Sequence, residues 1–501
     1  MQNQEFNPFQ LSSQQLSSSV DEALTLLKDH LDKLGSLPVK AQVEPGAVAA
    51  QFAQGVPESG QSLTELCAHI QKNLLPAVTH WQHPKFFAYY PASTSIPAIV
   101  SELIIATIGS VGLQWSANPA ATELECIVMD WILDLLQAPK ESPFRHTSRQ
   151  GGGIIQNTAG EALTIVMVAA RIQAHCRKHK ESQTLSLEDL YWQDSSSLVA
   201  YMSDQTHFSG PKAVRVAGIR LRKLPAQRLA NGNLGITAAQ VREAMQKDRE
   251  QGLTPCVVQL NFGSTNTCGY DDLASFHGFA ESENVWIHVD AAYAGPAFIL
   301  PEWQKSSHTL QDIATSFNFN GSKWFLCGFD SAFLFIRDRK LLKQVFSADG
   351  DYLARVHDEE VYNPELKDWS IPLGRRFRAL RIWMVLSYFG REGLQHFLRR
   401  AIDQADHARA RIEASSSFEH IVKTDLGLVC FKLKTDDKIK NESFIKKLEA
   451  LSDHGKQFLI YPSLLAGESF LRLALGGVET ELHHVDEFLD LCEKLAKEIL
   501  A

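Results

Sequence analysis

The stretch "VWIHVDAAYAG", residues 285–295, predicts a buried strand that ends on a carboxylate. Similar short runs lie between residues 197 and 338: "SLVAYMSD", "AVRVAGIRL", "PCVVQLNFGST", "IATSFNF" and "SAFLFIRD". Several are nearly continuous in apolar residues, which is typical of strands covered on both faces. Because helical segments alternate with these runs, the sequence predicts βαβ units and an α/β fold with a mostly parallel central sheet.

The segments on either side of this sheet predict two smaller parts. A chain of 501 residues is too long for one core, since single cores stop growing at roughly 250–300 residues. Amphipathic helical patterns precede residue 95, and "LGLVCFKLK", "SFLRLALGG" and a terminal helical run follow residue 380. We therefore predict an N-terminal helical segment (1–95), a large α/β domain (96–380) and a small αβ domain (381–501).

Composition narrows the classes of function. A net charge of −9 with scattered Lys and Arg argues against nucleic-acid binding. Apolar runs fall short of the roughly 18 residues that span a bilayer, and no basic residue precedes Lys28, so we expect neither membrane insertion nor a secretory signal. The eight dispersed cysteines form no C-x-x-C pair. We expect reduced thiols in a cytoplasmic protein, and no metal site.

Asp290 is the first candidate site residue, because ligands of open α/β sheets bind outside the carboxyl ends of the strands. A buried carboxylate there is costly unless a cation or strong donor meets it. A helix cap or a local Asx turn is an equally good explanation of this residue. Ala291 and Ala292 leave room for a flat group close to the backbone.

The stretch "GGGIIQNTAGEALTIVMVAARI" predicts the start of a helix. Thr158 and Glu161 have the spacing of a capping box. Backbone N–H groups of Thr158, Ala159 and Gly160 would form an anion site supported by the helix dipole. Taken alone, this motif is better explained by plain helix capping.

His207 follows the predicted strand "LVAYMSD". An imidazole can stack on a flat ring and titrates near neutrality, although an isolated histidine is more often structural. Asp204 could orient this ring or cap the next helix.

Lys323 lies among aromatic residues in "SFNFNGSKWFLCGFD", residues 316–330. Desolvation would lower its pKa, and a neutral amine can form a Schiff base with a carbonyl compound. A side chain whose ammonium reaches solvent is the alternative. Together, the four motifs occur in the order of a pyridoxal phosphate site: helix for phosphate, Asp290 for the pyridinium nitrogen and Lys323 for the aldehyde.

Six blocks carry a family resemblance over nearly the whole chain: "HPKFFAYYPAS", "NPAATELECIVMDW", "SDQTH", "HVDAAYAGPAFILPE", "SFNFNGSKW" and "WSIPLGRRFRAL". The sequence resembles the group II pyridoxal-phosphate decarboxylases, most closely the aromatic-L-amino-acid decarboxylases. The resemblance implies the fold type I of pyridoxal-phosphate transferases and a homodimer with sites at its interface. It also implies decarboxylation of an L-amino acid, aromatic by preference, to an amine and carbon dioxide.

The resemblance also implies roles for individual residues. Lys323 would bind the cofactor covalently, His207 and Ala292 would lie on opposite faces of its ring, and Asp290 would pair with its nitrogen. Tyr352, in "SADGDYLARVHDEE", would return a proton to Cα. The remaining cofactor contacts would be Thr158, Ala159, Gly160, Thr265, Asn320 and Ser322. The substrate pocket would contain Trp81, Tyr89, Tyr90, Pro91 and Gly374, with Val111 and Leu113 supplied by the second subunit.

Departures from the family pattern keep alternatives open. Gly321-Ser322 stands where relatives usually have Pro-His, Gly160 where a serine is common, and Leu113 where an aromatic residue is usual. Gly374 resembles members that admit bulky aromatic or indole rings. One alternative is a group II enzyme that acts on acidic or diamino substrates, and another is a cofactor-binding protein without turnover. A third is a family member that forms an aldehyde, although Tyr352 argues against it.

Overall fold

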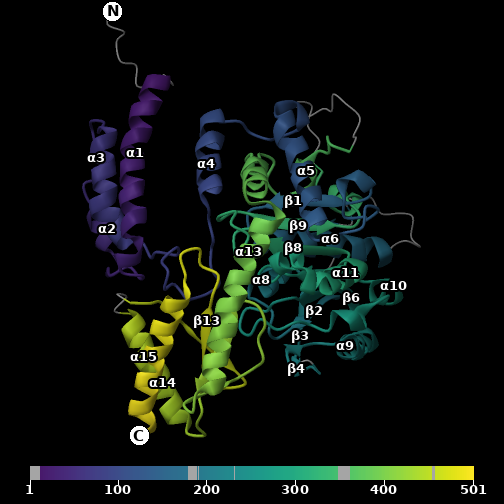
Figure 1. The fold of residues 1–501 in the computed structure, drawn as a ribbon. Coiled ribbons are helices and arrows are strands. Elements are labelled where there is room, and N and C mark those ends of the chain that lie inside the picture. Colours follow the sequence, from purple (N-terminus) through teal and green to yellow (C-terminus); the bar gives the residue numbers. More distant parts are fainter. Residues whose placement is uncertain are drawn as a thin grey trace, which may run out of the picture.

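The computed structural model describes residues 12–178, 189, 191–193, 195–230, 232–347, 361–453 and 457–501. Its centre is a seven-stranded sheet (Figure 1) in the order β1-β9-β8-β7-β6-β2-β3. Every neighbouring pair from β3 to β8 is parallel, and only β9 runs against its neighbours. The predicted α/β fold with a mostly parallel sheet is therefore confirmed. The strands are β1 (Gly152–Gln156), β2 (Leu198–Ser203), β3 (Arg220–Leu224), β6 (Thr254–Asn261), β7 (Trp286–Asp290), β8 (Ser316–Asn320) and β9 (Ala332–Ile336).

Helices cover both faces of this sheet, which explains why its inner strands are apolar on both sides. One face packs on α6 (Ala159–Lys178), α8 (Ser209–Val216) and α12 (Lys340–Phe346). The other face packs on further helices: α5 (Pro119–Leu135), α9 (Ala238–Glu250), α10 (Phe279–Glu283), α11 (Gln304–Ile313) and the start of α13 (Arg378–Ala414). The short hairpin of β4 (Gln227–Arg228) and β5 (Leu234–Gly235) stands outside the main sheet.

Two local predictions were wrong. Residues 213–216 of the predicted strand "AVRVAGIRL" end helix α8, in which Ala213 and Val214 are buried and the flanking basic side chains face outward. Strand β1, which begins with glycines, was not predicted. Those glycines are required by packing: a Cβ on Gly153 would lie 2.5 Å from Cε of Met129.

The C-terminal part is a second, antiparallel sheet in the order β10-β11-β13-β12. Helix α13 leads into it and bends at Gly390, whose φ is 60°. The sheet packs against α14 (Lys438–Asp453) and α15 (Leu482–Leu500). The two strands predicted here are present, within a sheet of β10 (Phe418–His420), β11 (Leu428–Leu433), β12 (Pro462–Leu465) and β13 (Glu468–Ala474).

The N-terminal helices lie to one side of the α/β body (Figure 1). They are α1 (Ser13–Lys33), α2 (Ala47–Ala50) and α3 (Leu63–His69), followed by α4 (Ile96–Ile108), which lies near α13. No helix in the described ranges combines the length and apolar character needed to cross a membrane. The predicted boundary at residue 95 precedes α4 and the one at residue 380 falls inside α13, and this division into domains stays a prediction.

Candidate active site

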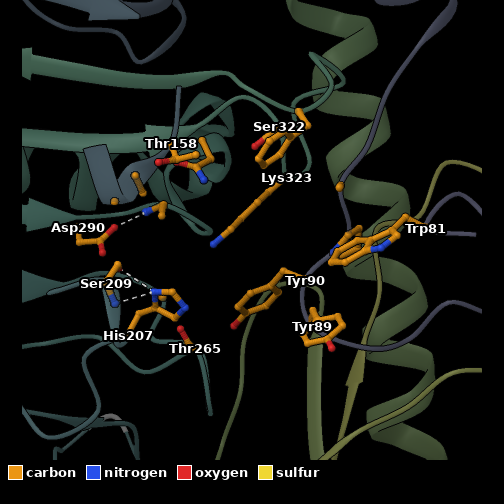
Figure 2. Close-up of a pocket in the computed structure, with 18 of the residues that line it drawn as sticks. Trp81, Tyr89, Tyr90, Thr158, His207, Ser209, Thr265, Asp290, Ser322 and Lys323 are labelled. Carbon is orange, nitrogen blue, oxygen red and sulfur yellow. Dashed lines mark hydrogen bonds between the residues drawn. The ribbon is translucent and has the colours of Figure 1, made fainter. Parts of the chain in front are cut away.

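A cavity of about 780 Å³ lies at the carboxyl ends of the parallel strands. It is bordered by the loop before α4, the first turn of α6 and strand β13 (Figure 2). This position is the one expected for a ligand of an open α/β sheet. The cavity brings together most of the predicted residues: Trp81, Tyr89, Tyr90, Pro91, Thr158, Ala159, Gly160, His207, Thr265, Asp290, Ala292, Asn320, Ser322 and Lys323.

Lys323 points its amine into this cavity, not outward to bulk solvent (Figure 2). Nζ lies 5.2 Å from the centroid of the Tyr90 ring, which stacks on Tyr293 at 3.6 Å. Burial lowers the pKa of Lys323 to about 8, against the opposing effect of the Asp290 charge and with the help of Arg472. The amine is therefore poised to be neutral far more readily than an ordinary lysine, as a nucleophile requires.

Asp290 ends β7 and is nearly buried. Its Oδ1 accepts hydrogen bonds from the backbone N–H of Ala292 at 3.0 Å and from Nδ2 of Asn318 at 3.4 Å. The Ala292 bond is the Asx-type turn considered from the sequence. Because both bonds use Oδ1, Oδ2 is the oxygen left to meet a group in the cavity.

The ring of His207 is held in one tautomer by Ser209. Its Nδ1 lies 3.3 Å from the Ser209 backbone N–H and 2.7 Å from Oγ. A backbone N–H can only donate, so Nδ1 accepts and the neutral ring carries its proton on Nε2. Burial, and next the charge of Lys323, lower the pKa of His207, which favours this neutral form. The hypothesis that Asp204 orients His207 was wrong: Asp204 accepts from the Ala226 N–H at 3.1 Å.

The first turn of α6 opens onto the other end of the cavity. Thr158 caps this helix, because its Oγ1 accepts from the Glu161 N–H at 3.2 Å. The carboxylate of Glu161 accepts from the Asn157 N–H at 2.7 Å. Nearby, Oδ1 of Asn320 is buried and has no hydrogen-bond partner among the described residues. The free N–H groups of the helix N-terminus suit a phosphate group, and Asn320 can add a donor only through its Nδ2.

Gly321 is explained by its packing. A Cβ at this position would lie 2.6 Å from Cζ of Phe333 and 3.1 Å from Oγ of Ser331. The fully buried Phe333 ring thus fills the space that a proline ring would need. Ser322 keeps a backbone hydrogen bond to the Ser331 carbonyl at 3.3 Å and lines the cavity.

Replacing Gly321 with alanine should therefore lower the free energy of unfolding by about 1–3 kcal/mol, the usual effect of overpacking. Denaturant unfolding of the cofactor-free protein measures it. The Phe333→Leu change should recover part of the loss in the double variant. Gly160→Ala is the matched control, because the nearest atom to its Cβ is 3.6 Å away. Equal stability of the Gly321 and Gly160 variants would contradict the packing argument.

Aromatic side chains form the outer part of the cavity. Trp81 stacks on Tyr89 at 5.2 Å with an interplanar angle of 9°, and Tyr461 lies 5.1 Å from Tyr89. Tyr89 has a φ of 54°, which is uncommon for a residue with a side chain. Phe208 and Phe329 stand largely exposed at the margin. An apolar ring would find several partners here, and a strongly charged side chain would find few.

Three predicted residues among those described do not line this cavity within the chain. Val111 is exposed, Leu113 borders a separate small hollow, and a Cβ on Gly374 would lie 3.4 Å from Cγ1 of Val111. Their assignment to the pocket, with Val111 and Leu113 coming from a second subunit, stays a prediction. Tyr352 lies outside the described residues.

Arg472 is a cavity residue that the sequence reasoning missed. It projects from β13, donates to the carbonyls of Thr265 at 2.6 Å and Asn266 at 3.1 Å, and lies over the ring of Tyr90. It thereby ties the C-terminal part to the loop that carries Thr265. The only available signal was an arginine within the apolar run "SFLRLALGG".

Comparison with known proteins agrees with this geometry. Residues 45–434 match the family model described as the pyridoxal-dependent decarboxylase conserved domain. The aromatic-L-amino-acid decarboxylase of Rattus norvegicus is 34% identical, covering 96% of this chain and 97% of its own. The phenylacetaldehyde synthase of Arabidopsis thaliana is 34% identical, covering 98% and 97%.

A solved structure, Catharanthus roseus tryptophan decarboxylase in complex with L-tryptophan, superposes with a TM-score of 0.87 at 31% identity, covering 99% of this chain and 100% of that one. The family model covers well over half of the 501 residues. A nucleophilic lysine, a strand-end carboxylate and a helix N-terminus around one cavity are also what the cofactor of such enzymes needs. The chain therefore belongs to the pyridoxal-dependent decarboxylase family.

Proposed function

We propose that this protein converts an aromatic L-amino acid to its amine and carbon dioxide. The observation that carries the proposal is the Lys323 amine, desolvated beside Tyr90 in a cavity with an aromatic outer wall. Asp290 and the first turn of α6 border the same cavity. Pyridoxal phosphate, when bound, supplies an electron sink for the pair released as the Cα–carboxylate bond breaks.

The side chains around the cavity would hold the cofactor and orient the substrate. Lys323 would hold the cofactor through its Nζ, and Oδ2 of Asp290 would keep a proton on the ring nitrogen. His207 and Ala292 would confine the ring, and Nε2–H of His207 is available as a donor. Thr158, Ala159, Gly160, Asn320 and Ser322 would hold the phosphate, with Thr265 near the ring. Trp81, Tyr89, Tyr90 and Pro91 would orient the substrate.

The pKa of Lys323 predicts how cofactor attachment depends on pH. The neutral fraction of this amine rises with pH and saturates above about 8, whereas an ordinary lysine saturates above 10.5. The rate of attachment to cofactor-free protein, followed by stopped-flow absorbance, should therefore level off above about pH 8. A rate that keeps climbing far beyond that pH would contradict the assignment.

The same shift affects stability. The folded-state pKa lies below the ordinary value, so between about pH 8 and 10.5 the unfolded chain holds more protons at this residue. Lys323 therefore favours unfolding below about pH 8, and this penalty is relieved as the pH rises through that window.

The substrate class is tested by a carbon dioxide release panel. It comprises the twenty amino acids, dihydroxyphenylalanine and 5-hydroxytryptophan, with pyridoxal phosphate supplied. We expect release from at least one aromatic member, because the stacked Trp81 and Tyr89 offer an aromatic ring its partners. Release from glutamate or diaminobutyrate alone would reject the aromatic assignment. Cofactor binding without release from any member would indicate a binding protein.

Tyr352 separates amine formation from aldehyde formation. Its proposed role, returning a proton to Cα, rests on the sequence resemblance. The Tyr352→Phe variant should form amine about a hundredfold more slowly, the lower end of general acid effects, and should release an aldehyde by-product. Chromatography of both products measures the ratio. An unchanged amine yield would rule out this role.

A homodimer is also part of the proposal. Apolar side chains of α4 and the residues after it are exposed in the single chain: Ile99, Val100, Leu103, Ile104, Ile108 and Val111. Such a patch favours a protein partner, and a second copy would bring Val111 and Leu113 to the neighbouring cavity. Sedimentation equilibrium should give a mass near twice 55.9 kDa. A cytoplasmic location stays a prediction from the eight free cysteines.

A further inference from the structure

Six polar side chains form a buried array on one face of three adjacent strands. In the sheet, His288 of β7 pairs with Gln259 of β6 and with Ser316 of β8. Two residues further along, Asp290 of β7 pairs with Asn261 and with Asn318. Residues two apart on a strand share a face, so all six side chains lie on the same side of the sheet. Each is at most 8% exposed. Polar groups buried this deeply destabilise a fold unless they are hydrogen-bonded.

A continuous chain of hydrogen bonds runs through this array to Asp290. Nε1 of Trp286 donates to Oγ of Ser316 at 2.8 Å, and Oγ lies 2.8 Å from Nδ1 of His288. Nε2 of His288 lies 2.8 Å from Oδ1 of Asn318. Nδ2 of Asn318 donates to Oδ1 of Asp290 at 3.4 Å, the longest link. Trp286, Ser316, His288 and Asn318 are all fully buried.

The two ends of this chain fix the direction of every proton in it. An indole N–H can only donate, and a carboxylate can only accept. Because Nδ2 of Asn318 donates to Asp290, its Oδ1 accepts from Nε2–H of His288. Nδ1 of the neutral ring then accepts from the Ser316 hydroxyl, whose Oγ accepts from Trp286. Burial lowers the pKa of His288 to about 4, which keeps the ring neutral as this order requires. Each link polarises the next, and all of them point at Asp290.

We propose that Asn318 and His288 are positioning residues, which fix the rotation of the Asp290 carboxylate and leave its Oδ2 facing the ring nitrogen of the cofactor. This inference rests on the proposed pairing of Asp290 with that nitrogen. The donors on Oδ1 and the rigid pair of strands fix the rotation of this carboxylate. Without the Asn318 donor the carboxylate can turn, so Oδ2 no longer faces the ring nitrogen and holds its proton less well.

The test replaces Asn318 with leucine, which keeps its branched shape and removes the donor to Asp290. Cofactor affinity is measured by fluorescence titration with pyridoxal phosphate, and ring protonation by solid-state NMR of the ¹⁵N-labelled cofactor bound to the full chain. We expect affinity to fall roughly tenfold, the size of a lost hydrogen bond to a charged group. The ring-nitrogen shift should move toward the neutral-ring value, which a purely structural defect would not cause.

Gln259→Met is the matched control. Gln259 is buried on the same face beside His288, but neither of its amide atoms has a hydrogen-bond partner among the described residues. Its replacement should leave both affinity and ring-nitrogen shift unchanged. Ser316→Ala removes only a hydroxyl and should give a smaller change in the same direction as Asn318→Leu, which keeps the test valid if the larger change prevents folding.

The outcomes separate this inference from the function on which it rests. Failure of the unaltered protein to bind pyridoxal phosphate would reject the proposed function itself. Normal binding and a protonated ring in both the Asn318 and Ser316 variants, while Asp290→Asn still shifts the ring-nitrogen signal, would overturn the positioning role alone. An equal loss in the Gln259 control would also overturn it, since the effect would then belong to the packing of that face.

Discussion

Replacing Lys323 with alanine is expected to abolish carbon dioxide release, with a loss of about three orders of magnitude or more, as for other covalent nucleophiles. Lys323 is the lysine that lines the cavity, and its desolvated amine lies over Tyr90. An alanine cannot form the carbon–nitrogen double bond to the cofactor. Borohydride reduction followed by peptide mapping should label the peptide containing Lys323 in the unaltered protein and no peptide in the variant.

A second variant and a binding measurement complete this experiment. Lys323→Arg keeps the positive charge but cannot attach the cofactor, so it should be as inactive as Lys323→Ala. Both variants should still bind pyridoxal phosphate weakly, because Asp290 and the first turn of α6 are unchanged. Label found on another lysine, or activity within a few-fold of normal in either variant, would remove the chemical basis of the proposed function.

Replacing Asp290 with asparagine should lower kcat by about 10²–10³-fold, the range seen when one preorganised electrostatic group is removed. A neutral amide cannot keep a proton on the ring nitrogen, so the cofactor withdraws electrons less well. Asparagine has nearly the same shape as aspartate, so it fits the buried position and can still accept both hydrogen bonds at Oδ1. The loss should therefore appear in kcat and in the absorbance of the bound cofactor more than in protein stability.

Asp338→Asn serves as the matched control for this carboxylate. Asp338 also follows a strand, but β9 runs against its neighbours and delivers it to the opposite edge of the sheet. Its Oδ1 accepts a local bond from the Lys340 N–H, at 2.9 Å. Its replacement should leave kcat unchanged. A similar loss in both variants would show that the Asp290 effect is a general response to lost charge.

Much of the central sheet was predictable from local sequence patterns. Apolar runs buried on both faces predicted β2, β6, β7, β8 and β9, because such runs fit only a sheet covered by helices. Local patterns were insufficient at β1, whose Gly153 is set by the approach of Met129, a neighbour distant in sequence. They were also insufficient at residues 213–216, because a helical turn can bury the same apolar residues as a strand would.

The sequence by itself determined which chemical groups follow the strands: Asp290, His207, Lys323 and the cap at Thr158. It could do so because parallel strands deliver their carboxyl ends to one edge of the sheet. Only the tertiary structure decided the partners of these groups: Ser209 rather than Asp204 for His207, Arg472 against Tyr90, and the buried chain from Trp286 to Asp290. Ser209 reaches His207 through the local turn before α8. The other partners come from strands whose lateral pairing leaves no local pattern, since register is set by packing across the whole sheet.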